Sequence, residues 1–120
     1  MKIAITSQGA ANESQIDQRF GRAKYFCIYD DQNGTWETVD NVQNFEAAHG
    51  AGVQSASLVA NKECKIVITG HCGPKAFRTL TAAGIEVYLC DSGSVLEALD
   101  KFMKKELAKA DASNAQSHWQ

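Results

Sequence analysis

The sequence VITGHCGPKAFRTLTAAGIEVY (residues 67–88) decides which fold the chain can adopt. Apolar-rich runs at 65–69 and 85–89 predict two strands. Between them, apolar residues recur at helical spacing, and Gly73-Pro74 places a proline in the first helical turn. A strand, a helix and a second strand in this order form a right-handed crossover between parallel strands. The stretch therefore predicts an α/β sheet covered by helices.

Three more strand candidates precede this unit, at residues 2–6, 24–30 and 35–40. Asn33-Gly34, a strong hairpin signal, joins the last two. If the first strand runs up, the second runs down and the third runs up. The helices then return the chain, so that the fourth and fifth strands also run up. We therefore expect a mixed sheet of five strands in which one strand is antiparallel.

Three helices are predicted from apolar residues that share one face. These residues are Val53, Ala56, Val59 and Ala60 in the first helix, Ala76, Phe77, Leu80 and Ala83 in the second, and Leu96, Leu99, Met103 and Leu107 in the third. Ser94 and Glu97 fit a capping box at the start of the third helix, and Gly84 closes the second. The last apolar stripe ends there, so we expect one domain over 1–107 and a flexible tail over 108–120.

The composition is that of an ordinary soluble globular domain. The 120 residues are 44% hydrophobic and 22% charged, enough to bury a core without disulfide bonds. A formal net charge of -2 provides no overall basic field, which argues against nucleic acid as a partner. Met1-Lys2 leads straight into a strand candidate that is too short for an export signal or a membrane span. We therefore expect a cytoplasmic protein that does not bind membranes.

The strand directions bring four connecting segments to one rim of the sheet, where open α/β sheets bind ligands. These segments are residues 7–23, 41–52, 70–74 and 90–94. The first carries Arg19 and Arg22 around Phe20-Gly21, the second carries His49-Gly50, and the third carries His71, Cys72, Gly73 and Lys75. Three helix N-termini are also expected at this rim, and glycines there let an anion approach backbone N–H groups. The rim therefore predicts a site for an anion.

Two of the four cysteines are expected at the same rim. A thiol at a helix N-terminus beside a histidine should have a lowered pKa, so we expect Cys72 to be partly thiolate next to His71. Cys90 should lie beside Cys72 if the fourth and fifth strands are neighbours. Thiolate and imidazole groups favour soft metals, which makes His71 and Cys72 candidate metal ligands. The cysteine spacing matches neither a zinc knuckle nor a standard ferredoxin motif.

Two other functions remain open on the residues alone. A small thiol-dependent redox or transfer enzyme could use Cys72, although no carboxylate is placed to orient a histidine for nucleophilic catalysis. An interaction module with an empty rim would need none of this chemistry.

The chain resembles the dinitrogenase iron–molybdenum cofactor biosynthesis family over residues 1–107. The resemblance rests on four stretches: KIAITSQG at 2–9, DQRFGRAKYFCIYD at 17–30, NFEAAHGAG at 44–52 and VITGHCGPKAFRTLTAAGIEVY at 67–88. It implies a three-layer α/β/α sandwich of ribonuclease-H-like topology with a mixed five-stranded sheet. It also implies that the protein holds a pre-formed metal–sulfur cluster non-covalently and without catalysis.

The resemblance further implies which residues hold the cluster. These are Phe20, Gly21 and Arg22, the His49-Gly50 pair and the Gly73-Pro74 turn. Cys72 stands where relatives commonly carry an aliphatic residue. In the short single-domain branch of the family the cargo is a mixed molybdenum–copper sulfide cluster, and the alternative is the iron–molybdenum cofactor or a related cluster. P-loop ATPases are the protein partners that the resemblance implies.

Overall fold

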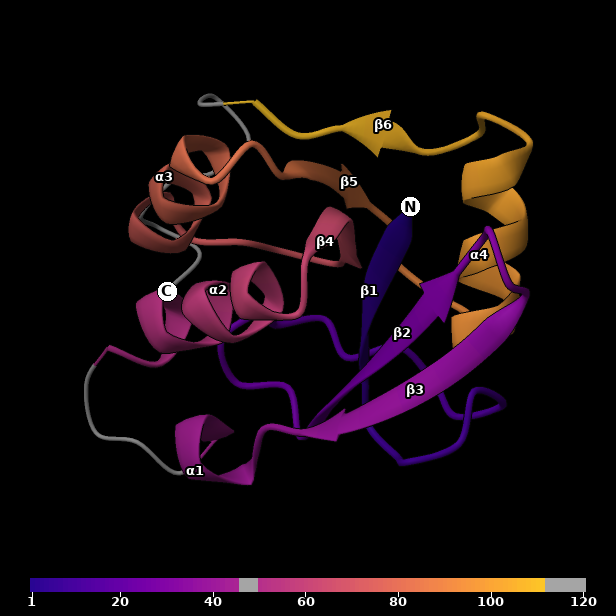
Figure 1. Ribbon diagram of the computed structural model, residues 1–120, viewed down its shortest axis with the longest axis horizontal. Coiled ribbons are helices and arrows are strands. Elements are labelled where there is room, and N and C mark those ends of the chain that lie inside the picture. Colours follow the sequence, from indigo (N-terminus) through magenta and orange to yellow (C-terminus); the bar gives the residue numbers. More distant parts are fainter. Residues whose placement is uncertain (46–49, 112–120) are drawn as a thin grey trace.

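A computed structural model of the chain describes residues 1–45 and 50–111. In chain order the elements are β1 (Lys2–Ser7), β2 (Tyr25–Asp30), β3 (Thr35–Asp40), α1 (Val42–Phe45), α2 (Ala51–Asn61), β4 (Cys64–Thr69), α3 (Pro74–Ala82), β5 (Glu86–Leu89), α4 (Val95–Met103) and β6 (Ala108–Lys109). Figure 1 shows α2 and α3 on one side of the sheet and α4 on the other. None of the helices in the described ranges reaches the length and apolar character that crossing a bilayer requires.

The sheet has six strands in the order β3-β2-β1-β4-β5-β6. β1, β4 and β5 are parallel neighbours, and β2 pairs antiparallel with both β1 and β3. These directions confirm the predicted tracing of the first five strands. The predicted total of five strands with one antiparallel member is wrong, because β6 adds an antiparallel pair with β5. The ribonuclease-H-like topology stays a prediction.

The β2–β3 hairpin turns where the Asn33-Gly34 signal predicts it. Gly34 has a φ of 68°, a left-handed conformation that a residue without a β-carbon adopts at no steric cost. Its N–H donates to the Asp30 carbonyl at 2.8 Å, which closes the turn. The hairpin connection therefore lies at the end of the sheet opposite to the carboxyl ends of β1, β4 and β5 and leaves that rim clear.

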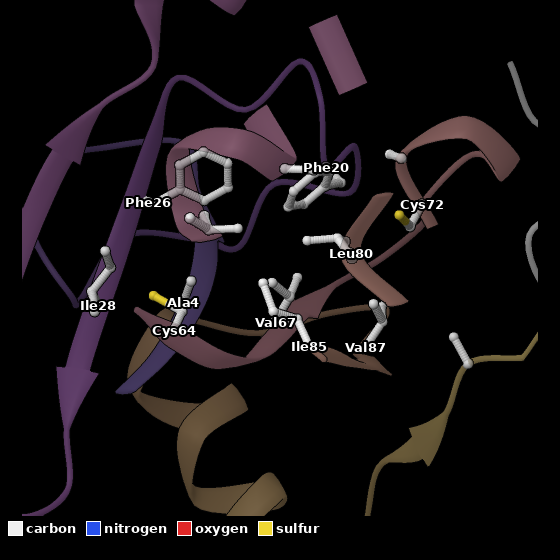
Figure 2. Close-up of a cluster of buried hydrophobic side chains, with 14 residues drawn as sticks. Ala4, Phe20, Phe26, Ile28, Cys64, Val67, Cys72, Leu80, Ile85 and Val87 are labelled. Carbon is white, nitrogen blue, oxygen red and sulfur yellow. The ribbon is translucent and has the colours of Figure 1, made fainter. Parts of the chain in front are cut away.

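The two faces of the sheet carry separate cores. Side chains alternate along β1, so Ala4 joins the core under α2 and α3, whereas Ile3 and Ile5 join the core under α4. Figure 2 shows the first core, in which the rings of Phe20 and Phe26 pack with their centroids 5.5 Å apart. The chain thus forms three layers, held together by the apolar surface that the sheet buries on both faces.

Helix α4 buries only part of its predicted face, because Leu99 packs against the core and two other predicted residues, Leu96 and Met103, are exposed. Val95 and Ala98 are fully buried, whereas Leu96 and Met103 are 42% and 46% exposed. The sequence carries two adjacent apolar stripes here, and the hydrophobic period fits both. The structure buries the stripe with the smaller side chains, which lets α4 lie close against β1. The predicted face of α2 is wrong in the same way at Val53, which is 38% exposed.

Helix α4 also ends earlier than the apolar stripe predicts, at Met103. Lys105 takes a left-handed conformation, with a φ of 61°. Its N–H donates to the Phe102 carbonyl, and the next N–H, of Glu106, donates to the Lys101 carbonyl. This pair of bonds is a Schellman motif, which reverses the chain here without the glycine that usually signals it.

The reversed chain then pairs with β5 as β6. Ala110 is buried, and its N–H donates to the Val87 carbonyl at 2.8 Å. Leu107 lies outside the helix in which the sequence places it, and the predicted boundary at 107 falls directly before a strand. Residues 112–120 of the predicted tail lie outside the described residues.

Val95→Ala should destabilise the protein more than Leu96→Ala, which is the reverse of what the apolar stripe predicts. Because Val95 is fully buried, losing its side chain should lower the free energy of unfolding by about 2 kcal/mol. The largely exposed Leu96 should cost well under about 1 kcal/mol. Urea unfolding followed by circular dichroism measures both changes. An equal or larger loss for Leu96→Ala would contradict the observed face.

Candidate functional site

The long segment between β1 and β2 folds back over the carboxyl ends of the parallel strands. The Asp17 N–H donates to the Thr6 carbonyl at 2.9 Å, and the Thr6 hydroxyl donates to the Asp17 carbonyl at 2.6 Å. Further along, the Phe20 N–H donates to the His71 carbonyl at 3.0 Å. The first two bonds tie the loop to β1, and the third ties it to the turn after β4. The two segments therefore meet at one rim, as predicted.

A cavity of about 390 Å³ opens at this rim between the loop and the first turns of α2 and α3. Its lining residues are Arg19, Phe20, Gly21, Arg22, Gly50, Ala51, Gly52, Val53, His71, Gly73, Lys75 and Ala76. Among the described residues that the sequence predicts to bind the cluster or its metal, only Cys72 and Pro74 are missing from this lining. That the lining residues bind a cluster stays a prediction. His49 lies outside the described residues.

Close packing between backbones shapes the wall of the cavity. A β-carbon on Gly21 would lie 2.7 Å from both the Cα and the N of Gly52, a separation that real β-carbons essentially never show. A β-carbon on Gly52 would in turn lie 3.0 Å from the β-carbon of Ala76. The loop therefore packs against α2, and α2 against α3, closely enough that neither glycine has room for a β-carbon without a shift of its neighbours. The wall at this point consists of main chain and small side chains.

The lining carries positive charge in a chain that is acidic overall. Its charged residues are Arg19, Arg22 and Lys75, and the described lining contains no carboxylate. Asp17, buried outside the lining, accepts the Arg19 N–H at 2.9 Å and lies 3.7 Å from Arg19 Nε. Because the Arg19 side chain is 62% exposed, this ion pair is weak and does not prevent Arg19 from meeting an anion.

The first turns of α2 and α3 add backbone donors to the cavity. The first N–H groups of an α-helix have no acceptor within the helix, and together they act as roughly half a positive charge. Gly50 and Gly73 stand at the two N-cap positions and offer no side-chain oxygen to these groups. A bound anion can take the place of the missing capping side chain.

The third predicted helix N-terminus, that of α4, does not contribute to the cavity. Helix α4 covers the opposite face of the sheet. The N–H groups of Val95 and Leu96 donate to carbonyls of the β1–β2 loop. The Glu97 N–H donates to the Ser94 hydroxyl at 3.1 Å in a capping box, which confirms that prediction. The expectation of three helix N-termini around one site is therefore wrong.

Cys72 faces the core and not the cavity. It is 3% exposed and packs in the cluster under α2 and α3 that also contains Leu80 (Figure 2). Burial raises the pKa of Cys72 to about 12. The prediction of a partly thiolate Cys72 is wrong, because burial desolvates the thiol and disfavours its charged form. A neutral, buried thiol does not fit the predicted role of metal ligand, whereas His71 lines the cavity and stays a candidate.

The prediction that Cys90 lies beside Cys72 is wrong. Strands β4 and β5 are neighbours as expected, yet Cys90 belongs to the core on the opposite face of the sheet. Within residues 1–45 and 50–111, no group of three or more His, Cys, Asp or Glu side chains is placed to hold a metal ion.

Two buried polar residues behind the cavity are not singled out by the sequence. Ser55 lies in α2 and Asn41 follows β3, and both are fully buried. Their side chains donate to backbone carbonyls of the β1–β2 loop. The one available signal is that Ser55 stands four residues before Val59, on the face of α2 that the period predicts to be buried.

The chain belongs to the family described as dinitrogenase iron-molybdenum cofactor, whose pattern matches residues 1–105. This match confirms the resemblance found in the sequence. Because it spans β1 to α4, it includes every element that lines the cavity.

Two solved structures share both fold and sequence with this chain. The apo form of the orange protein from Desulfovibrio gigas is 35% identical with a TM-score of 0.87, and the match covers 91% of this chain and 92% of that one. A Thermotoga protein described as a candidate NifB protein of the DUF35 family is 38% identical with a TM-score of 0.81, covering 90% and 91%. An uncharacterised protein of Methanocaldococcus jannaschii is 32% identical over 111 residues, 91% of each chain.

Cys72 should resist alkylation in the folded protein. The thiolate is the reactive form, and a pKa of about 12 keeps Cys72 protonated at neutral pH and well into the alkaline range. Iodoacetamide treatment of the native protein, followed by peptide mass spectrometry, should leave Cys72 unmodified. The same treatment in denaturant should modify it. Rapid modification of native Cys72 at neutral pH would support an activated thiolate instead.

Proposed function

We propose that the protein is a non-enzymatic carrier that holds a pre-formed metal–sulfur cluster in the cavity between the β1–β2 loop, α2 and α3. The main support is the positive lining, in which Arg19, Arg22, Lys75 and two helix N-termini surround about 390 Å³. Membership of the dinitrogenase iron-molybdenum cofactor family supports the same function.

The donor set of the cavity suits an anionic sulfide cluster. Sulfides on the outside of such a cluster accept hydrogen bonds, and backbone N–H groups and arginine side chains supply them. The cavity volume falls within the range of about 300–1,000 Å³ that small-molecule sites occupy. A cluster that brings its own sulfides needs no protein thiolate, which agrees with the burial of Cys72.

We favour a mixed molybdenum–copper sulfide cluster as the cargo, with the iron–molybdenum cofactor or a related cluster as the alternative. Likeness to the orange protein over nearly the whole length of both chains supports the short single-domain branch, to which the resemblance assigns that cargo. His71 is the candidate for a direct bond to metal. Transfer to or from P-loop ATPase partners in the cytoplasm completes the proposed role.

The competing function, a thiol-dependent redox or transfer enzyme, lacks an available nucleophile. Cys72 is buried, and its pKa is raised to about 12. Nucleophilic catalysis would require a thiolate that is open to substrate. The carrier function requires no reactive thiolate and no thiol that is open to substrate.

Arg22→Ala should weaken binding of the cluster formed from tetrathiomolybdate and copper(I). The loss should be about 1–3 kcal/mol, the usual range for a hydrogen bond assisted by charge. Titration of the apo protein, followed by the visible absorption of the cluster, measures the affinity. Raising the salt concentration should also weaken uptake by the wild type, because exposed charges are screened within about 10 Å at 0.1 M.

Arg78→Ala provides the matched control. Arg78 is an exposed residue of α3 outside the cavity lining, and its loss changes the net charge by the same amount. It should leave affinity close to that of the wild type. Binding that is insensitive both to salt and to Arg22→Ala would mean that metal coordination or apolar packing retains the cluster. A wild type that takes up neither this cluster nor the iron–molybdenum cofactor would overturn the carrier function itself.

A further inference from the structure

We propose that Ser55 and Asn41 are positioning residues for Arg22. Their buried side chains hold the two backbone carbonyls on either side of Arg22 and so fix this part of the loop against α2. Arg22 lines the cavity described above, so this positioning role rests on the proposed function.

The side chains of Ser55 and Asn41 are polar and yet fully buried, which is unusual and calls for an explanation. Ser55 and Asn41 are both 0% exposed, and the neighbouring Asn44 is 2% exposed. A polar side chain in such surroundings destabilises the protein unless it is hydrogen-bonded. An apolar residue in the middle of α2 would avoid this cost, so the polar set needs a reason beyond packing.

The hydrogen bonds of the set converge on the loop. The Ser55 hydroxyl donates to the Gly21 carbonyl at 3.2 Å. Its single proton could also go to Asn41 Oδ1, but that oxygen is farther away, at 3.4 Å. Asn41 Nδ2 donates to the Ala23 carbonyl at 2.8 Å and to Ser55 Oγ at 3.1 Å.

The Ala23 carbonyl fixes the orientation of the Asn41 amide, because a carbonyl only accepts and the Asn41 nitrogen must therefore face the loop. The Asn41 oxygen then faces α1, where Asn44 Nδ2 donates to it at 2.8 Å. The Asn41 N–H also donates to the Lys24 carbonyl at 2.8 Å, which anchors its backbone to the start of β2. The donors toward Gly21 and Ala23 therefore have one consistent arrangement.

Holding these two carbonyls restricts the backbone of Arg22. The Gly21 carbonyl belongs to the peptide unit that joins Gly21 to Arg22, and the Ala23 carbonyl belongs to the unit that joins Ala23 to Lys24, two peptide units further on. With both oriented, the Arg22 side chain starts from a fixed backbone position at the cavity. Less conformational freedom is then lost when Arg22 contacts an anion, which raises affinity.

Three single variants in α2 separate positioning from stability. Ser55→Ala should weaken binding of the tetrathiomolybdate–copper(I) cluster roughly fivefold, the change expected for one ordinary hydrogen bond. Ser57→Ala, on the exposed side of the same helix, should bind as the wild type does. Val59→Ala removes fully buried apolar surface outside the polar set. It should lower the unfolding temperature and leave affinity unchanged.

A double variant tests whether Ser55 acts through Arg22. In the Arg22→Ala background, Ser55→Ala should cause no further loss of affinity, because the side chain that it positions is gone. Ser55→Ala also removes a buried hydrogen bond and should lower the unfolding temperature. That decrease should be the same with Arg22 and with Ala at position 22. Equal affinity losses in the two backgrounds, or the wild-type affinity in Ser55→Ala, would overturn the positioning role.

A measurement without ligand keeps this inference separate from the proposed function. NMR backbone order parameters of Arg22 and Ala23 in the apo protein should fall in Ser55→Ala and remain unchanged in Ser57→Ala and Val59→Ala. Unchanged order in Ser55→Ala would overturn the inference even if the wild type binds the cluster. A wild type that binds neither the tetrathiomolybdate–copper(I) cluster nor the iron–molybdenum cofactor, combined with reduced order in Ser55→Ala, would contradict the carrier function and retain the backbone restraint.

Discussion

The close approach of two backbones at Gly21 and Gly52 is the constraint on which the cavity depends. A β-carbon at Gly21 would lie 2.7 Å from backbone atoms of Gly52, so any side chain would force the loop away from α2. That separation would open the cavity wall and lengthen the Ser55 hydrogen bond to the Gly21 carbonyl, 3.2 Å long in the intact site. Steric contact and buried polar bonding therefore enforce the same loop position.

The fold follows from the sequence wherever a local signal sets it. Gly73-Pro74 and Asn33-Gly34 fix backbone conformations through the residues themselves, so the turns that they predict are present. The end of α4 carries no such signal, because Lys105 adopts a left-handed conformation that glycine usually provides. The stop is therefore a tertiary effect, and so is β6, whose two residues are too few for a period.

The candidate site also has some features that the sequence predicts and others that only the folded structure reveals. Topology alone predicts that the loop, the start of α2 and the turn after β4 meet at one rim, because parallel strands end at the same edge. The direction of the Cys72 side chain within a tight turn is not a periodic property, and the sequence assigns it wrongly. Ser55 and Asn41 escape sequence reasoning for a different reason, since both residue types usually lie on the surface.

The burial of every cysteine has a chemical meaning under the proposed function, in which the chain carries a cluster of soft metals. Cys27, Cys64, Cys72 and Cys90 are all buried, and burial raises the pKa of the first three. Exposed thiolates compete strongly for copper and would draw metal ions out of a sulfide cluster. Thiols buried in two apolar cores do not compete. If the proposed function holds, a carrier built in this way can release its cargo with the composition in which it was received.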